Sequence, residues 1–270
     1  MRISSVAALE FDDALENVRL AYIRDGGHDA FGPSGFFWLG GFRSDMRGSK
    51  AESLANLASS TRRQLTRFDY SGHGESSGLF TDGTISDWLE QSTHMFLQHA
   101  KGKRILVGSS MGGWLALLLA RRLREEDPSA FRRLAGMVLL APATDMTQDL
   151  MWDHFNDAAR QELRDTGMYQ RPSAYGEPYA ITVKLLADGE KHLLLRDKLY
   201  LPFPVRILQG SDDVDVPPPH AIKTFEALTG PDITLTFIKD GDHRLSSAGQ
   251  LRLLKETVLD LAKRADGETF

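Results

Sequence analysis

Gly108-Ser109-Ser110-Met111-Gly112 is the stretch of the sequence that decides the fold. It follows the pattern G-x-S-x-G and lies between two apolar segments. Residues 104–107, Arg-Ile-Leu-Val, predict a short buried strand, and residues 113–120, Gly-Trp-Leu-Ala-Leu-Leu-Leu-Ala, predict a buried helix. A strand, a sharp turn and a helix form the setting in which a serine hydroxyl is held at the tip of the turn as a nucleophile. Glycines at 108 and 112 would let the strand and the helix approach closely.

The same pattern occurs a second time, at residues 74–78. The strand predicted over residues 65–70 ends before a Ser-Gly-His-Gly turn, and residues 79–83 are typical of a turn and not of a buried helix. Because the motif requires a strand before it and a helix after it, we interpret the second copy as a loop. Ser110 is then the candidate nucleophile, since the glycines are centred on it and not on Ser109. The alternative for Ser110 is an ordinary turn rich in glycine and serine.

The composition is that of a globular protein. The chain has 270 residues, of which 41% are hydrophobic and 26% are charged, which fits one large domain or one domain with an insertion. The net charge of −5 provides no basic field for a nucleic acid partner. The sequence contains no cysteine, which excludes thiol nucleophiles, disulfides and thiolate metal sites.

The location of the protein is predicted from its first residues and its hydropathy. Residues 1–20 carry Glu10, Asp12, Asp13 and Glu16 and no apolar segment, so no secretory signal is expected. No run approaches the ~18 apolar residues of a membrane span. We therefore expect a cytoplasmic protein, or one whose organellar leader is not part of this sequence. The sequence leaves the oligomeric state open.

Strand and helix patterns alternate along most of the chain. Strands are predicted over residues 18–23, 35–39, 65–70, 104–107, 137–142, 205–210 and 233–238, and helices over residues 49–60, 85–99, 113–120 and 251–262. This alternation predicts an α/β fold with a mostly parallel central sheet and helices on both of its faces.

Residues 144–201 interrupt the alternation. They lie between two predicted strands, where one helix would suffice, and they contain several aromatic side chains. We interpret them as a lid inserted over the carboxyl edge of the sheet, with residues 1–143 and 202–270 forming the core, because exposed aromatic residues without a pocket would reduce solubility. Trp152, Tyr175 and Tyr179 are the candidate substrate-binding residues of this lid. The alternative is a surface excursion without a role.

A serine nucleophile needs a base, and the base needs a carboxylate to orient it. His243 follows the predicted strand 233–238, and Asp213 follows the strand 205–210 by three residues after Gly210. The order Ser, Asp, His is the one found when such a motif lies in a hydrolase of this architecture. Asp212 and Asp215 are interpreted as turn-stabilising or exposed. Asp145, after the preceding strand, is the alternative acid.

An acyl-transfer site also needs two N–H donors for the oxyanion. The backbone of Met111, directly after Ser110, would supply one. Phe42, in the Gly40-Gly41-Phe42 stretch after the strand 35–39, is the candidate for the other, and Gly41 would let the substrate approach the backbone. An ordinary Gly-Gly turn is the alternative.

No cofactor or metal is expected. The other histidines show no metal-ligand spacing on a helix, and His73, in a tight Gly-His-Gly loop, has no role that a motif defines. The sequence contains neither a dinucleotide-binding glycine loop nor a phosphate-binding P-loop.

These motifs together resemble the α/β-hydrolase family over nearly the whole chain. The closer similarity is to the branch that contains the mitochondrial acyl-glucuronide esterase and palmitoyl-protein thioesterase, and it is found in Arg67-Phe68-Asp69-Tyr70-Ser71-Gly72, in residues 105–115 around the motif, and in Asp242-His243-Arg244. The resemblance implies that Ser110, Asp213 and His243 take the nucleophile, acid and base positions. The His-Gly that is frequent at the oxyanion loop of the family is Gly40-Gly41 here.

The resulting prediction is a serine hydrolase that cleaves small-molecule carboxylic esters or thioesters through an acyl-enzyme intermediate. A cofactor-free perhydrolase would share the same three residues, and a non-catalytic small-molecule receptor on the same fold is the alternative from another class. A serine at the motif disfavours a haloalkane dehalogenase, which would need a carboxylate nucleophile. The lack of a separate peptide-binding domain disfavours a peptidase.

Overall fold

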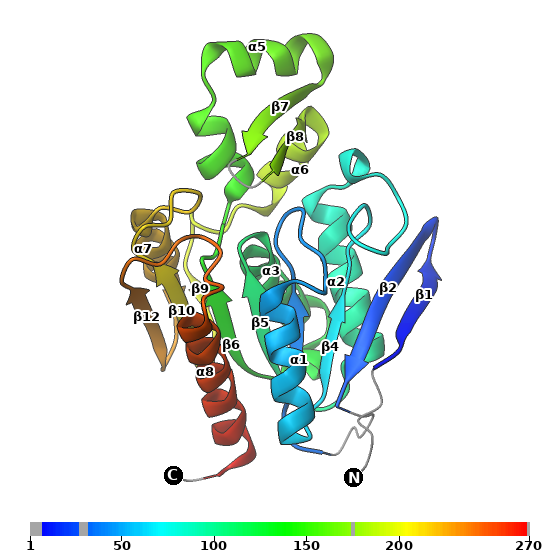
Figure 1. Cartoon of the computed structure of the whole chain (residues 1–270), viewed down its shortest axis with the longest axis vertical. Coiled ribbons are helices and arrows are strands. Elements are labelled where there is room, and N and C mark those ends of the chain that lie inside the picture. The colour runs from blue at the N-terminus through cyan, green and yellow to red at the C-terminus, as the bar shows by residue number, and fades with distance from the viewer. Residues whose placement is uncertain (1–6, 27–31, 174–175, 269–270) are drawn as a thin grey trace.

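The computed structural model describes residues 7–26, 32–173 and 176–268 (Figure 1). The strands of the central sheet are β1 (Leu9–Leu15), β2 (Val18–Asp25), β3 (Gly35–Leu39), β4 (Leu65–Phe68), β5 (Arg104–Ser109), β6 (Leu134–Leu140), β10 (Val205–Gly210) and β12 (Ile233–Ile238). The helices around it are α1 (Ser49–Thr61), α2 (Ile85–His99), α3 (Met111–Glu126), α4 (Pro128–Phe131), α7 (Pro218–Ala227) and α8 (Ala248–Asp266), and the short helix η1 covers Phe80–Asp82.

Within the described residues, the central sheet has eight strands in the order β1-β2-β4-β3-β5-β6-β10-β12. The six strands from β4 to β12 pair in parallel, whereas β2 pairs antiparallel with both β1 and β4. The predicted α/β fold with a mostly parallel sheet is confirmed. The edge strand β1 was not predicted from the sequence, and it extends the sheet through a hairpin with β2.

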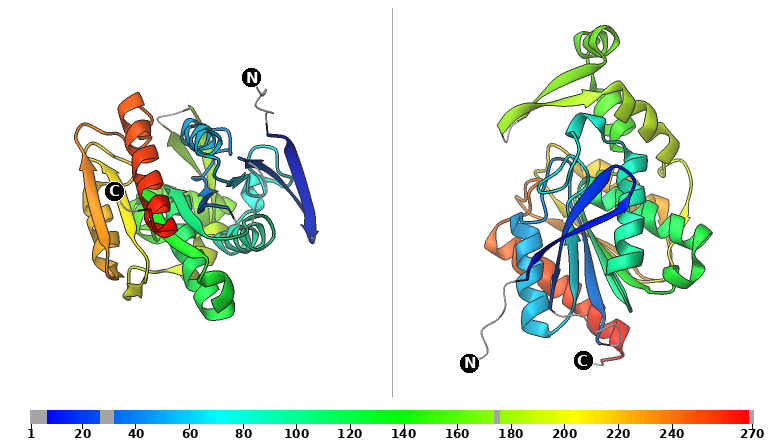
Figure 2. Two further views of the ribbon diagram at one scale, coloured as in Figure 1. Left: turned by 90° about the horizontal axis from the view of Figure 1, so that it is seen from below. Right: turned by 90° about the vertical axis from the view of Figure 1, so that its right-hand side faces the viewer.

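The apolar side chains of the central strands alternate between the two faces of the sheet. Phe36 and Trp38 pack with α1 and α8 on one face, and Phe37 and Leu39 pack with α2 and α3 on the other. Figure 2 shows these helices on opposite sides of the sheet. Strands covered on both faces need apolar residues at every position, which explains why their sequences are continuous apolar runs.

Helix α3 is the most buried helix of the core, because every residue from Met111 to Ala120 is buried. Its leucine and alanine residues are strong helix formers. Because they are apolar and lie on every side of the helix, this part of α3 can be buried on all sides. Helix α8 begins before the predicted segment because a capping box of Ser247 and Gln250 starts it at Ala248.

Within residues 144–201, the elements from η2 to α6 form a layer above the carboxyl ends of the strands, whereas β9 lies beside the core (Figure 1). The elements of this segment are η2 (Thr147–Met151), η3 (Trp152–His154), α5 (Asp157–Thr166), β7 (Met168–Ser173), β8 (Gly176–Thr182), α6 (Val183–Gly189), η4 (Glu190–His192) and β9 (Leu199–Tyr200). Strands β7 and β8 form an antiparallel hairpin that belongs to no other sheet. The division of the chain into a core and a lid stays a prediction.

The last part of this layer is held to the core by polar contacts. The Asp188 carboxylate accepts hydrogen bonds from the backbone N–H of Ser86 at 2.7 Å and from its hydroxyl at 2.8 Å. The Trp114 indole on α3 donates to the backbone carbonyl of His192 at 3.2 Å. Helix α6 and η4 are therefore fixed on α2 and α3. No helix within the described residues has the length and apolarity needed to cross a membrane.

Candidate active site

Ser110 occupies the sharp turn between β5 and α3. Its φ of 55° and ψ of −119° lie in a region that residues with a side chain rarely adopt. The flanking glycines allow the turn, because a Cβ atom on Gly112 would lie 2.0 Å from the Leu39 carbonyl oxygen and one on Gly108 would lie 2.3 Å from the Gly112 carbonyl oxygen. The conformation expected of a nucleophile elbow is therefore present at this copy of the motif.

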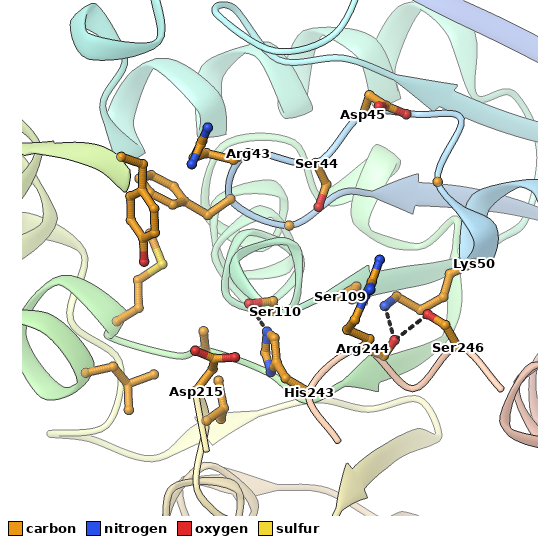
Figure 3. Close-up of a pocket in the computed structure, with 18 of the residues that line it drawn as sticks. Arg43, Ser44, Asp45, Lys50, Ser109, Ser110, Asp215, His243, Arg244 and Ser246 are labelled. Carbon is orange, nitrogen blue, oxygen red and sulfur yellow. Dashed lines mark hydrogen bonds between the residues drawn. The ribbon is translucent and has the colours of Figure 1, made fainter. Parts of the chain in front are cut away.

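The structure brings Ser110, His243 and Asp213 together. His243, in the loop after β12, places Nε2 3.0 Å from Ser110 Oγ and Nδ1 2.9 Å from Asp213 Oδ2. Figure 3 shows the contact between the His243 ring and Ser110. With the proton on Nδ1 donated to the carboxylate, Nε2 is left to accept the proton of the serine hydroxyl.

The carboxylate of Asp213 is buried and held in one orientation. Its Oδ1 accepts hydrogen bonds from the backbone N–H groups of Asp215 at 3.0 Å and Val216 at 2.8 Å, and its Oδ2 accepts one from the Gln209 amide at 3.0 Å. These donors compensate the charge of a buried carboxylate and aim Oδ2 at His243.

The other candidate acids have different surroundings. Asp145 accepts hydrogen bonds from the backbone N–H groups of Leu194 and Leu195, at 2.7 and 2.9 Å, and so holds the end of the lid segment. Burial raises the pKa of its carboxyl group. Asp212 is exposed and accepts a hydrogen bond from Ser211.

Asp215 was expected to be exposed or turn-stabilising, and the structure places it half-buried in the wall of the site instead. Its Oδ2 atom is buried and has no hydrogen-bond partner within the described residues. A carboxylate oxygen of Asp215 lies within 4.8 Å of ligand atoms of Asp213 and His243. A second carboxylate therefore stands beside the base, at a position that spacing in the sequence does not reveal.

The loop after β3, residues 40–46, lies directly over the elbow. A Cβ atom on Gly41 would lie 3.4 Å from Ser110 Cβ and 3.3 Å from the Ser109 carbonyl oxygen, so this glycine approaches the nucleophile closely. Phe42 follows it, and its ring packs against Tyr179 of the lid hairpin at 5.7 Å between centroids. Met111, directly after Ser110, begins α3.

A cavity of about 750 Å³ opens above Ser110. One part of its lining is apolar and comes mainly from η2 and from the residues between β6 and η2. Another part is polar and comes from the loops around Ser44 and Arg244 (Figure 3). The apolar lining includes Phe42, Ala143, Met146, Leu150, Met151 and Val216. A cavity with one apolar and one polar part suits a substrate with a hydrocarbon portion and a polar portion.

The lid residues predicted to bind substrate differ in their positions. Tyr179 and Gly41 line the cavity, whereas Trp152 is 36% exposed, does not line it, and has the Arg160 guanidinium 5.1 Å from its ring centroid. Tyr175 lies outside the described residues.

Charged residues at the cavity were missed by the sequence analysis. Arg43, Lys50, Arg171 and Arg244 line it together with Asp45 and Asp215, so positive charge is in excess and favours the approach of anionic molecules. The Lys50 ammonium donates to the Arg244 carbonyl oxygen, next to His243, and burial lowers the pKa of this lysine to about 8. Arg43 and Arg244 lie in loops that follow strands, which is a weak signal in the sequence, whereas Lys50 lies at the start of α1 and Arg171 lies on β7.

Among the residues that the structure describes, two groups of side chains have donor atoms close enough together to hold a metal ion. One is Asp213, Asp215 and His243, which belongs to the site already described. The other lies at the edge of the sheet, where the Asp12 carboxylate on β1 contacts Nε2 of His94 at 2.9 Å and Nε2 of His99 at 2.5 Å. These contacts satisfy the three side chains with one another and tie β1 to α2.

A sequence model described as the α/β hydrolase family matches residues 19–255. The chain belongs to the α/β hydrolase family, as the resemblance of its motifs predicted. It is 30% identical to the mitochondrial palmitoyl-protein thioesterase ABHD10 of Mus musculus, over 94% of this chain and 82% of the relative.

Two solved structures extend this similarity to the whole fold. A putative hydrolase from Agrobacterium vitis S4 matches with a TM-score of 0.89 at 38% identity, covering 95% of this chain and 98% of that one. The α/β hydrolase domain-containing protein 10 from mouse matches with a TM-score of 0.84 at 29% identity, covering 96% of this chain and 99% of that one. Hydrolysis is the class of reaction that the family and these relatives support.

Proposed function

We propose that this protein is a serine hydrolase that cleaves carboxylic esters or thioesters through an acyl-enzyme intermediate. The observation that carries the proposal is the chain of contacts from Asp213 through His243 to Ser110, at 2.9 and 3.0 Å, at the floor of a cavity. A nucleophile, a base and an orienting carboxylate within hydrogen-bond reach are what acyl transfer requires.

In the first half of the reaction, Ser110 Oγ attacks the carbonyl carbon of the substrate while His243 Nε2 takes its proton. The Asp213 carboxylate stabilises the imidazolium that forms. The backbone N–H groups of Met111 and Phe42 bind the negative oxygen of the tetrahedral intermediate. We therefore name residues 40–46, which contain Phe42, the oxyanion loop. The intermediate collapses when the bond to the leaving alcohol or thiol breaks and His243 returns the proton to that group.

In the second half, a water molecule replaces the leaving group. His243 removes one proton from the water as its oxygen attacks the acyl-enzyme, and then returns that proton to Ser110 Oγ. The carboxylic acid is released and the serine hydroxyl is restored. His243 takes up and returns the proton in both halves of the reaction.

The lining of the cavity supports a substrate with a hydrocarbon acyl group. Met146, Leu150 and Met151 form an apolar part of the wall beside Ser110, and such a wall binds methylene groups without selecting one length sharply. The mouse relative is named a palmitoyl-protein thioesterase, which supports the inclusion of thioesters. That relative is also named as mitochondrial, and the cytoplasmic location of this chain stays a prediction.

The test is covalent labelling with a fluorophosphonate, followed by turnover of a panel of p-nitrophenyl esters and acyl-CoA thioesters of graded length. The wild-type protein and Ser109→Ala are expected to be labelled, and Ser110→Ala is not. Turnover of at least one class of substrate must disappear in Ser110→Ala. A folded wild-type protein that is neither labelled nor active on the panel would contradict the proposal and favour a non-catalytic receptor.

A further inference from the structure

We propose that His73 is a positioning residue that holds the oxyanion loop in the conformation needed to stabilise the transition state. The proposal rests on the proposed function, because it assigns the support of a donor that acts in acyl transfer. His73 lies in the loop between β4 and η1, far in sequence from Ser110, Asp213 and His243.

The contact that carries the proposal joins His73 to the residue after Phe42. The backbone N–H of Arg43 donates a hydrogen bond to His73 Nε2 at 3.1 Å. Since Nε2 accepts this bond, the proton of the neutral ring is on Nδ1, which lies 3.1 Å from the Ser71 carbonyl oxygen and donates to it. Two backbone contacts therefore define one tautomer and one orientation of the ring.

The backbone that His73 holds is strained. Arg43 is not a glycine, and its φ is 59°, in the left-handed region. Such a conformation persists only where surrounding contacts enforce it. The hydrogen bond to His73 acts on the peptide group that links Phe42 to Arg43, so it limits the rotation of the residue whose own N–H is assigned to the oxyanion.

The His73 ring is itself held rigidly. It is 4% exposed, and it packs against Tyr70, Phe80 and Trp88, with ring centroids 5.5, 5.3 and 5.2 Å away. The Trp88 indole donates to the same Ser71 carbonyl oxygen at 3.2 Å. Burial lowers the pKa of His73, which keeps the ring neutral and able to accept the bond from Arg43.

A second contact fixes the far end of the oxyanion loop. The Asp69 carboxylate accepts hydrogen bonds from the backbone N–H of Met46 at 2.6 Å and from that of Glu75 at 2.9 Å. The segment that contains His73 is thus bonded to the oxyanion loop at two points, Arg43 and Met46. Gly41 and Phe42 lie between Gly40, where the oxyanion loop starts, and these two points. They are therefore held over Ser110.

This arrangement predicts a specific kinetic signature. An oxyanion is present in the transition state and not in the bound substrate, so weakening its donor lowers kcat and leaves KM unchanged. A residue that only stabilises the fold would change the midpoint of thermal unfolding, and would not alter kcat per folded molecule.

The experiment compares His73→Phe, which keeps a ring but has no acceptor, with His73→Gln, whose side-chain oxygen can accept the Arg43 N–H. Loss of a whole oxyanion donor lowers kcat by about 10²–10³-fold, so a misplaced donor in His73→Phe is expected to lower it by roughly 10–100-fold. KM for the same p-nitrophenyl ester should stay within about twofold. His73→Gln should recover most of kcat, and the rate of fluorophosphonate labelling should follow kcat in each variant.

Ser76→Ala is the matched control, because Ser76 lies in the same loop and bonds to Asp69 and Ala21 instead of to the oxyanion loop. It should lose stability and keep kcat. The proposal is overturned if His73→Phe keeps wild-type kcat, if its effect is entirely on KM, or if His73→Gln and Ser76→Ala lower kcat as much as His73→Phe does.

Two further measurements keep the result unambiguous. Nitrogen NMR of the wild-type imidazole should show His73 protonated at Nδ1 alone at neutral pH, and protonation at Nε2 would overturn the proposal even if His73→Phe fails to fold. Ser110→Ala is measured in parallel. If it remains active, the proposed function fails; if it is inactive while His73→Phe is fully active, only the role of His73 fails.

Discussion

The two copies of G-x-S-x-G in this chain have the same pattern and opposite surroundings. At Ser110 the backbone is strained, and His243 Nε2 lies 3.0 Å from the hydroxyl. At Ser76 the hydroxyl donates to the Asp69 carbonyl oxygen at 2.6 Å and accepts from the Ala21 N–H at 2.9 Å. The Ser110 hydroxyl faces a base, whereas the Ser76 hydroxyl makes both of these hydrogen bonds with backbone groups.

The difference shows that the elements on either side of the motif decide the role of its serine. The first copy joins a central parallel strand to a buried helix, and so its serine lies at the edge of the sheet where other loops meet. The second copy follows β4 without a helix of its own, and its serine ties the loop to β2. Substitutions at the two serines and at the residues around them test this contrast.

Ser110→Ala is expected to lower ester turnover by roughly 10⁴–10⁶-fold, since loss of a nucleophile leaves only the oxyanion donors and binding. Circular dichroism should show an intact fold, because Ala removes one hydroxyl. The measurement is kcat on one p-nitrophenyl ester with fluorophosphonate labelling. Labelling that survives Ser110→Ala and disappears in Ser76→Ala would exchange the roles of the two copies.

Asp213→Asn is expected to lower kcat by about 10⁴-fold, because an amide favours the wrong tautomer of His243. Asp212→Asn is the matched control, since Asp212 is exposed and should leave kcat unchanged. Asp215→Asn should have an intermediate effect, because Asp215 lines the cavity beside the base. Wild-type turnover of Asp213→Asn, measured with the same ester, would remove Asp213 from the site.

Much of the fold was predictable because buried parallel strands are continuous apolar runs. The bounds predicted for β3, α2, β10 and β12 agree with the structure. Strand β1 was missed because Glu10, Asp12 and Asp13 are polar residues of an exposed edge strand. Helix α7 was missed because it begins with prolines, which fit its first turn but give no apolar period.

The site was predictable only where a motif fixes a residue relative to a strand end. Ser110, Asp213 and His243 each follow a strand of the sheet, and the carboxyl ends of parallel strands meet at one edge. The positions of Asp215 and His73 depend on how their loops fold back over that edge, and the position of Lys50 depends on where α1 begins beside it. No local pattern encodes such contacts, because they join segments far apart in sequence.

Two aromatic residues of the lid also differ in their surroundings. Tyr179 lines the cavity and Trp152 does not. Tyr179→Ala should change the preference for acyl-chain length by up to about 1–3 kcal/mol per methylene in kcat/KM, since apolar pockets discriminate gradually. Trp152→Ala, the control, should leave the profile unchanged. If Trp152→Ala changes the chain-length preference on a graded ester series and Tyr179→Ala does not, the position assigned to the lid hairpin is contradicted.

Ser76→Ala should have the smallest effect on turnover. Loss of the Ser76 hydroxyl leaves the Ala21 N–H without this hydrogen-bond partner, which is expected to lower the free energy of unfolding by about 1–3 kcal/mol. Urea denaturation measures this loss, and kcat per folded molecule should equal that of the wild type. A large fall in kcat at unchanged stability would mean that the second copy takes part in chemistry.

The positive φ of Ser110 sets the thermal stability of the fold against its hydrolytic activity at a single residue. A backbone held in such a region costs on the order of 1–3 kcal/mol, and glycine alone adopts it without that penalty. Ser110→Gly should therefore unfold at a higher temperature than the wild type while hydrolysing nothing. An engineering campaign that selects this chain for heat resistance without also demanding turnover would be expected to discard the serine early.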